Sequence, residues 1–164
     1  MNVIFLGTGT SHGVPSIDCM LENYARCPKG VCALSNQDHK HRRTRSSILL
    51  QWEDKSILVD VSADFREQVL REKIKTIDAV LFTHHHADHT CGIPDIRSYT
   101  KHHPLDFYGS EETITNIQSA FQYIFNPGTF VGGGIPQLIA HSIETPFELF
   151  GLPIIPVHVN HGNL

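Results

Sequence analysis

The sequence predicts an α/β fold, on three observations. Short apolar runs, as expected of buried strands, alternate along the chain with two stretches of helical periodicity. The 164 residues are enough for one domain with a hydrophobic core, and they contain no internal repeat, linker or low-complexity segment. A polar, histidine-rich run directly follows one of the apolar runs, at the place where a strand would deliver a loop. We therefore expect residues 1–164 to form a single domain.

The strands of this fold are predicted from the apolar runs. Residues 8–45 read as a loop-rich, polar segment, and residues 53–55 as the turn of a hairpin. The expected strands are Asn2–Leu6, Ser47–Trp52, Ser56–Asp60, Ala79–Thr83, Leu105–Tyr108 and a series of strands and turns over Leu138–Val159.

Two helices are predicted between the strands. The first spans Ala63–Lys73, with Ser62 as its N-cap. The second follows the N-cap Ser110 and ends at Asn126-Pro127-Gly128, before a glycine run, 132–134, that marks a mobile loop. The residues expected on the apolar faces are Phe65, Val69 and Leu70 in the first helix and Ile114, Ile117, Phe121, Ile124 and Phe125 in the second.

The candidate metal-binding motif is the run Thr83-His84-His85-His86-Ala87-Asp88-His89. His84 and His86 are two residues apart, so a short turn can direct both imidazoles at one ion, while Asp88 and His89 can serve a second ion. Imidazole and carboxylate ligands suit zinc, manganese or iron. A surface histidine cluster or a mononuclear structural site is the alternative. His85 alternates with the ligand positions and is expected to point away.

With this H-x-H-x-D-H motif after a core strand, the chain resembles the metallo-β-lactamase superfamily. The resemblance implies an αββα sandwich, of which this chain is the N-terminal portion, and two divalent ions, zinc or manganese. It further implies a third imidazole for the first ion from a later loop. His161 is the better match, because His158 lies inside an apparent strand and reads as a wall residue.

Asp60 ends a predicted strand, as does an acidic residue that the superfamily carries before its metal motif. Its expected role is to hold the metal loop through hydrogen bonds, and the alternative is a cap on the following helix. Asp88 and Asp60 are the candidate catalytic residues. The candidate metal ligands of the site are His84, His86, Asp88, His89 and His161.

Other motifs narrow the resemblance to a branch containing cyclic-phosphate phosphodiesterases of phosphonate breakdown. The chain opens with Leu6-Gly7-Thr8-Gly9 and Gly13-Val14-Pro15, continues with a cysteine cluster and Arg43-Thr44-Arg45-Ser46-Ser47, and carries Gly92-Ile93-Pro94-Asp95-Ile96-Arg97 after the metal loop. The function implied is hydrolysis of a small phosphodiester, cyclic or open, by metal-activated water. The alternatives are a lactone or thioester hydrolase, a tRNA-processing nuclease, or a non-catalytic metal-binding module.

Cys19, Cys27 and Cys32 lie in one irregular segment that has little means of packing itself. A structural zinc would order it, with His39, His41 or a residue outside the chain as fourth ligand, and free thiols are the alternative. Cys91, two residues past His89, reads as a small buried hydrophobe. The basic run 40–45 is expected to be a solvated loop or to attract an anionic substrate electrostatically.

Composition excludes some classes of function. The net charge of −4 does not suggest general nucleic-acid binding, and no apolar stretch is long enough to serve as a signal peptide or a membrane span. The expected compartment is cytoplasmic. The superfamily usually places a bridging aspartate, a last metal histidine and a second half of the sandwich after the point where this sequence stops. Three interpretations are open: a fragment, a fold completed by a second chain or in a homodimer, or a non-catalytic module.

Overall fold

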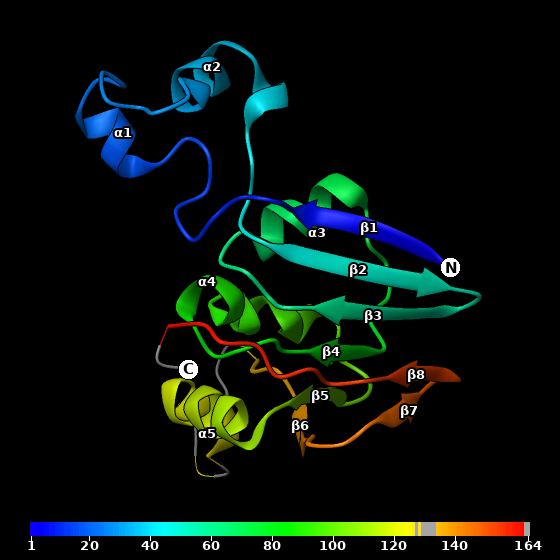
Figure 1. Ribbon diagram of the computed structural model, residues 1–164. Coiled ribbons are helices and arrows are strands. Elements are labelled where there is room, and N and C mark those ends of the chain that lie inside the picture. Colours follow the sequence, from blue (N-terminus) through cyan, green and yellow to red (C-terminus); the bar gives the residue numbers. More distant parts are fainter. Residues whose placement is uncertain (127, 129–133, 163–164) are drawn as a thin grey trace.

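A computed structural model describes residues 1–126, 128 and 134–162 (Figure 1). The predicted helix stop at 126–128 and the predicted mobile glycine loop at 132–134 therefore lie partly outside the described residues. The strands are β1 Asn2–Gly7, β2 Ser47–Trp52, β3 Lys55–Val59, β4 Ala79–Leu81, β5 Leu105–Gly109, β6 Leu138–Ser142, β7 Phe147–Leu149 and β8 Leu152–Ile154. The helices are α1 Ile17–Leu21, α2 Val31–Gln37, η1 His39–His41, α3 Phe65–Glu72, α4 Ala87–Thr90, η2 Ile93–Ser98, α5 Glu111–Ala120 and α6 Gln122–Phe125.

Six strands form one mixed sheet in the order β1-β2-β3-β4-β5-β6. The first three pair antiparallel, and β3 to β6 pair parallel, with α3 connecting β3 to β4 and α5 connecting β5 to β6. Parallel neighbours place their carboxyl ends at one edge of the sheet, where α/β proteins usually bind ligands. The predicted α/β class is confirmed.

The two faces of the sheet carry different apolar clusters, because successive side chains of a strand point to opposite faces. Leu49, Leu58, Val80 and Phe107 face a core shared with α3 and α5. Their strand neighbours on the other face pack against the antiparallel β7–β8 hairpin, whose Leu149 is buried there. The segment after β8 then runs back along the strands towards α4 (Figure 1).

The first predicted helix is corrected in three details. It begins at Phe65 with Asp64 as N-cap, and Ser62 lies two residues earlier, where its Oγ accepts a hydrogen bond from the Asp64 N–H at 3.2 Å. Leu70, expected on the apolar face, is 60% exposed. Gln68 is buried in its place, because hydrogen bonds to the Ser62 hydroxyl and the Arg45 carbonyl satisfy its amide.

The second predicted helix is confirmed at its start. Ser110 Oγ accepts a hydrogen bond from the Thr113 N–H at 3.2 Å. Glu111 and Glu112 occupy the first turn, where carboxylates interact favourably with the helix dipole. The helix ends at Ala120, and a separate turn of helix, α6, continues to Phe125. The predicted strand Ala79–Thr83 is shorter than expected, because β4 ends at Leu81.

Residues 16–41 form a lobe that projects from the sheet, with α1 and α2 at its end (Figure 1). The prediction of an irregular segment missed these short helices. Cys32 is the single buried apolar residue among them, while the large apolar side chains of Ile17, Leu21 and Leu34 are exposed. The lobe therefore lacks a hydrophobic core of its own. Within the described residues, no helix is long and apolar enough to cross a membrane.

Candidate metal centre

The histidine-rich loop begins where β4 ends, at the edge of the sheet that gathers the carboxyl ends of the parallel strands. Asp60 directly follows the neighbouring strand, β3. Backbone hydrogen bonds tie the two loops together, from the Asp60 N–H to the Leu81 carbonyl at 2.9 Å and from the Val61 N–H to the His89 carbonyl at 2.8 Å. Adjacent parallel strands thus bring together residues far apart in the sequence.

Three imidazoles meet at this edge. His84, His86 and His161 each offer a nitrogen, and these nitrogens lie within 4.8 Å of one another. The His84 Nε2 and His86 Nδ1 atoms are 3.0 Å apart. Tetrahedral zinc with Zn–N bonds of about 2.0–2.1 Å separates its ligand nitrogens by about 3.3 Å, so small side-chain movements would fit the three histidines around one ion.

His161 reaches this cluster from the segment after β8. Its ring centroid is 4.8 Å from that of His84 and 5.2 Å from that of His86. His158, which was expected to be a wall residue within a strand, is exposed and lies beyond β8, which ends at Ile154. The structure thus brings His161, the preferred of the two candidates, to the metal motif. Its role as a ligand stays a prediction.

Asp88 and His89 form a second, incomplete set beside the triad. The His89 ring is 4.1 Å from the His84 ring, centroid to centroid, and its Nε2 is 3.2 Å from Asp88 Oδ2. In the described part of the chain these two residues belong to no group of three potential ligands. They could supply two donors to a second ion, whose remaining donors the described residues do not include.

Asp60 is 4% exposed and accepts three hydrogen bonds. Its Oδ1 accepts from the Thr83 N–H at 2.8 Å, and its Oδ2 faces the Thr83 hydroxyl at 2.8 Å and His89 Nδ1 at 2.7 Å. In the neutral form of His89, a carboxylate at Nδ1 holds the ring proton there and would leave Nε2 available to a metal, a common arrangement behind metal-bound histidines. Asp60 does not cap α3, whose N-cap is Asp64.

The pKa values of two histidines of the site are shifted in opposite directions. Burial lowers the pKa of His84 to about 4, with the neighbouring His89 and His86 acting in the same direction, so its imidazole is neutral near pH 7. The hydrogen bond to Asp60 raises the pKa of His89 above its usual value. A neutral imidazole is the form that binds a metal, so His84 needs to release no proton at neutral pH.

Thr83 was not among the predicted site residues, yet it donates hydrogen bonds from both its N–H and its hydroxyl to Asp60. Its position directly before the histidine motif was the available signal. Cys91, expected to be buried, is exposed, because it lies at the outer end of α4. Position 92 requires glycine, because a Cβ there would lie 2.2 Å from the Ser62 carbonyl oxygen.

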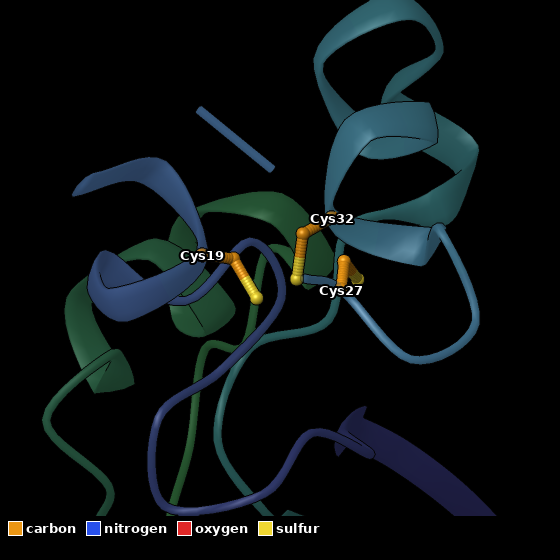
Figure 2. Close-up of side chains that lie close together, drawn as sticks. All are labelled: Cys19, Cys27 and Cys32. Atoms are coloured by element: carbon orange, nitrogen blue, oxygen red, sulfur yellow. The ribbon is translucent and has the colours of Figure 1, made fainter. Parts of the chain in front are cut away.

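A second cluster lies in the lobe. Cys19, on α1, Cys27, in the connecting loop, and Cys32, on α2, point their sulfur atoms toward one another (Figure 2). The three sulfurs lie within 4.8 Å of each other. Such a group suits a soft ion such as zinc. Neither His39 nor His41, the fourth ligands suggested by the sequence, belongs to this group.

Comparisons with known proteins agree with this geometry. The family model described as a beta-lactamase superfamily domain matches residues 55–164. The chain is 34% identical over 165 residues to an octanoyltransferase of Porphyromonas gingivalis (strain ATCC BAA-308 / W83), covering 100% of this chain and 32% of that protein.

Solved structures are also similar. A crystal structure of a new diphosphatase from the PhnP family has a TM-score of 0.80 and 38% identity, covering 99% of this chain and 58% of that one. Zinc-bound PqqB from Methylobacterium extorquens has a TM-score of 0.64 and 23% identity, over 90% of this chain and 48% of that one, which supports the fold alone. The chain thus spans 58% or less of these relatives' lengths. The resemblance drawn from the sequence is confirmed: the chain has the metallo-β-lactamase fold and belongs to the beta-lactamase superfamily.

Proposed function

We propose that this chain carries the metal-binding part of a metal-dependent hydrolase that cleaves a small phosphodiester. The observation that carries the proposal is the convergence of three imidazoles, His84, His86 and His161, beside Asp88 and His89. An ion bound there would supply Lewis-acid activation of water and of the ester. The choice of a phosphate ester is supported by the 38% identity to the PhnP-family diphosphatase.

The residues of the site would have different roles in metal binding and positioning. The three histidines would hold one divalent ion, zinc or manganese, in their neutral forms. Asp88 and His89 would add a carboxylate and an imidazole for a second ion. Asp60 would act through its neighbours, since its contacts are with Thr83 and His89. It is therefore better described as a positioning residue than as the catalytic residue that the sequence suggested.

An acyl substrate is the second candidate. The relative from Porphyromonas gingivalis is named an octanoyltransferase, and the present chain matches 32% of its length. A site that activates water for attack on phosphorus can also attack the carbonyl of a thioester or lactone. The name of that relative describes a protein three times as long, so it favours this candidate less than the PhnP-family structure favours a phosphodiester.

The test is hydrolysis of bis(p-nitrophenyl) phosphate and of a cyclic nucleoside phosphate by the protein with added zinc or manganese. We expect turnover that chelation removes, and a loss of at least about 100-fold in His84→Ala and His86→Ala. His85→Ala, a neighbour outside the triad, serves as the matched control and should keep its activity.

The outcomes separate the candidates. Turnover of an octanoyl thioester but of neither phosphodiester would replace the proposed substrate class with the acyl class. Full phosphodiesterase activity in either triad variant would refute the site. Stoichiometric metal without turnover of any ester would indicate a metal-binding module.

We also propose that the three cysteines of the lobe hold a zinc ion that stabilises it. The lobe has no hydrophobic core, and a structural metal contributes folding free energy in such segments. The ion would have no part in the chemistry proposed for the histidine site.

A further inference from the structure

We propose that the base of the lobe holds a second ligand site, for an organic phosphate carrying at least two negative charges. The site is a pocket of about 540 Å³, which we call the lobe-base pocket. Its charged lining residues are Arg42, Arg43, Arg71 and Glu67, with Phe5 and His39 beside them. Its volume lies in the range of about 300–1,000 Å³ that small-molecule sites occupy.

Three separate parts of the chain form this pocket. Phe5 belongs to β1, Glu67 and Arg71 belong to α3, and the arginine pair follows η1 at the point where the lobe rejoins the sheet. A smaller neighbouring pocket of about 170 Å³ shares Arg42, Arg43 and Glu67 with it. Neither pocket is lined by a residue of the metal centre, so the two sites are separate.

The charges of the pocket are not neutralised internally. Among the described residues, Arg42 and Arg43 have no carboxylate within 4.0 Å. Arg71 is paired with Glu72, so Arg42 and Arg43 are opposed only by Glu67, the one carboxylate of the lining. The pocket therefore keeps a net positive charge in a chain whose overall charge is −4.

Backbone carbonyls hold the guanidinium groups in place. Arg43 Nη1 donates to the carbonyls of Lys40 and Arg42, each at 2.7 Å, and Arg42 Nε donates to the Ser35 carbonyl at 3.4 Å. Arg71 Nη2 donates to the Leu6 carbonyl, while its Nε pairs with Glu72 at 2.7 Å. Within residues 1–126, 128 and 134–162, each group has further N–H donors without a hydrogen-bond partner. A guanidinium fixed in this way binds phosphate oxygens at a lower entropic cost.

The lining also favours an organic group on the phosphate. Phe5 is 62% exposed and borders the pocket, so a ring or alkyl portion of the ligand could cover its apolar surface. Inorganic phosphate would use the arginines and leave this surface in water. The chemistry thus points to a molecule such as a nucleoside diphosphate.

The probe is ADP, measured by isothermal titration calorimetry at low salt without a chelator, so that zinc proposed for the lobe cysteines stays bound. A His84→Ala variant reports whether the histidine site takes part. We expect saturable binding that weakens by about tenfold or more in the double variant Arg42→Gln, Arg43→Gln. Arg66→Gln, on the same helix α3 but outside the pocket, is the matched control and should bind ADP within twofold of the wild type.

Two further variants distinguish binding at this pocket from misfolding and from binding at the histidine site. Glu67→Gln removes the one carboxylate and should tighten ADP binding, which loss of folding could not mimic. His84→Ala should leave binding unchanged, and this separates the pocket from the proposed hydrolase. The proposal is overturned if ADP shows no saturable binding, if His84→Ala abolishes it, if Glu67→Gln weakens it, or if inorganic diphosphate binds as tightly as ADP.

Discussion

Asp60→Asn tests how the loop after β3 controls the metal site. Asparagine has nearly the same shape as aspartate and also tolerates the left-handed backbone of this position, where φ is 60°. Its amide oxygen can still accept the hydrogen bond from the Thr83 N–H. Its NH₂ group, however, would face His89 Nδ1, which would then have to accept a hydrogen bond instead of donating one.

The structure sets the size of the effect. One hydrogen bond between an imidazole and a buried carboxylate is lost, worth about 1.5–3 kcal/mol of the free energy of unfolding. The tautomer change moves the proton of His89 to Nε2, the nitrogen facing Asp88. Loss of such a supporting carboxylate typically weakens metal binding by about 10–100-fold. Alanine would cost about 1–2 kcal/mol more, because its side chain does not favour the left-handed conformation.

Three measurements test this reasoning. Urea unfolding gives the stability, competition with a chromophoric chelator gives the zinc affinity, and imidazole ¹⁵N shifts give the His89 tautomer. Asp78→Asn is the control, since Asp78 also accepts a backbone N–H, from Ser56 at 2.7 Å, but lies before β4, away from the metal loop. It should lose stability and keep its zinc affinity. An unchanged His89 tautomer and a zinc affinity within twofold in Asp60→Asn would refute the role of Asp60.

The remaining predictions concern the lobe, the pH response and the core. Cys19→Ser should release the zinc proposed for the lobe and increase hydrogen exchange in residues 16–41, whereas the control Cys91→Ser should not; an unchanged zinc content by elemental analysis would contradict this. In the metal-free protein, NMR should find His84 titrating at a pKa of about 4 and His89 above its usual value. The His84 contribution to stability should fall as the pH drops from about 6.5 to 4, because the unfolded chain takes up the proton first, and the His89 contribution should fall as the pH rises through its raised pKa; an ordinary pKa at both would contradict the site geometry. Phe107→Ala removes a ring that is 1% exposed and packs on Phe82 with a centroid distance of 5.8 Å, so urea unfolding should show a loss of about 3–5 kcal/mol, and a loss below about 1 kcal/mol would be inconsistent with this core.

Short-range features were predictable from the sequence. His84 and His86 are two residues apart after an apolar run, so their proximity depends on one turn and on little else. Ser110 was recognised as a cap because capping involves residues within one helical turn. The β2–β3 hairpin follows from two apolar runs and a short polar turn. In each case the residues that determine the structure are neighbours in the chain.

Burial was predicted wrongly where it depends on contacts with residues far away in the sequence. Leu70 and Gln68 are two residues apart on α3, and hydrophobicity alone assigns the wrong one to the interior. Gln68 is buried because groups from residues 44, 45 and 62 satisfy its amide. Cys91 is exposed because α4 ends at the surface, which its residue type does not indicate.

The amino-acid sequence was sufficient to predict the superfamily, the α/β class and the two local pairs, His84 with His86 and Asp88 with His89. The folded chain was needed to show that His161 rather than His158 joins the first pair, that Asp60 contacts the second, and that Arg42 and Arg43 line one pocket with Arg71 of α3. The physical reason is that local spacing is set by bond geometry and helix or strand period, whereas long-range proximity depends on the order and register of strands, which form only when the whole sheet packs.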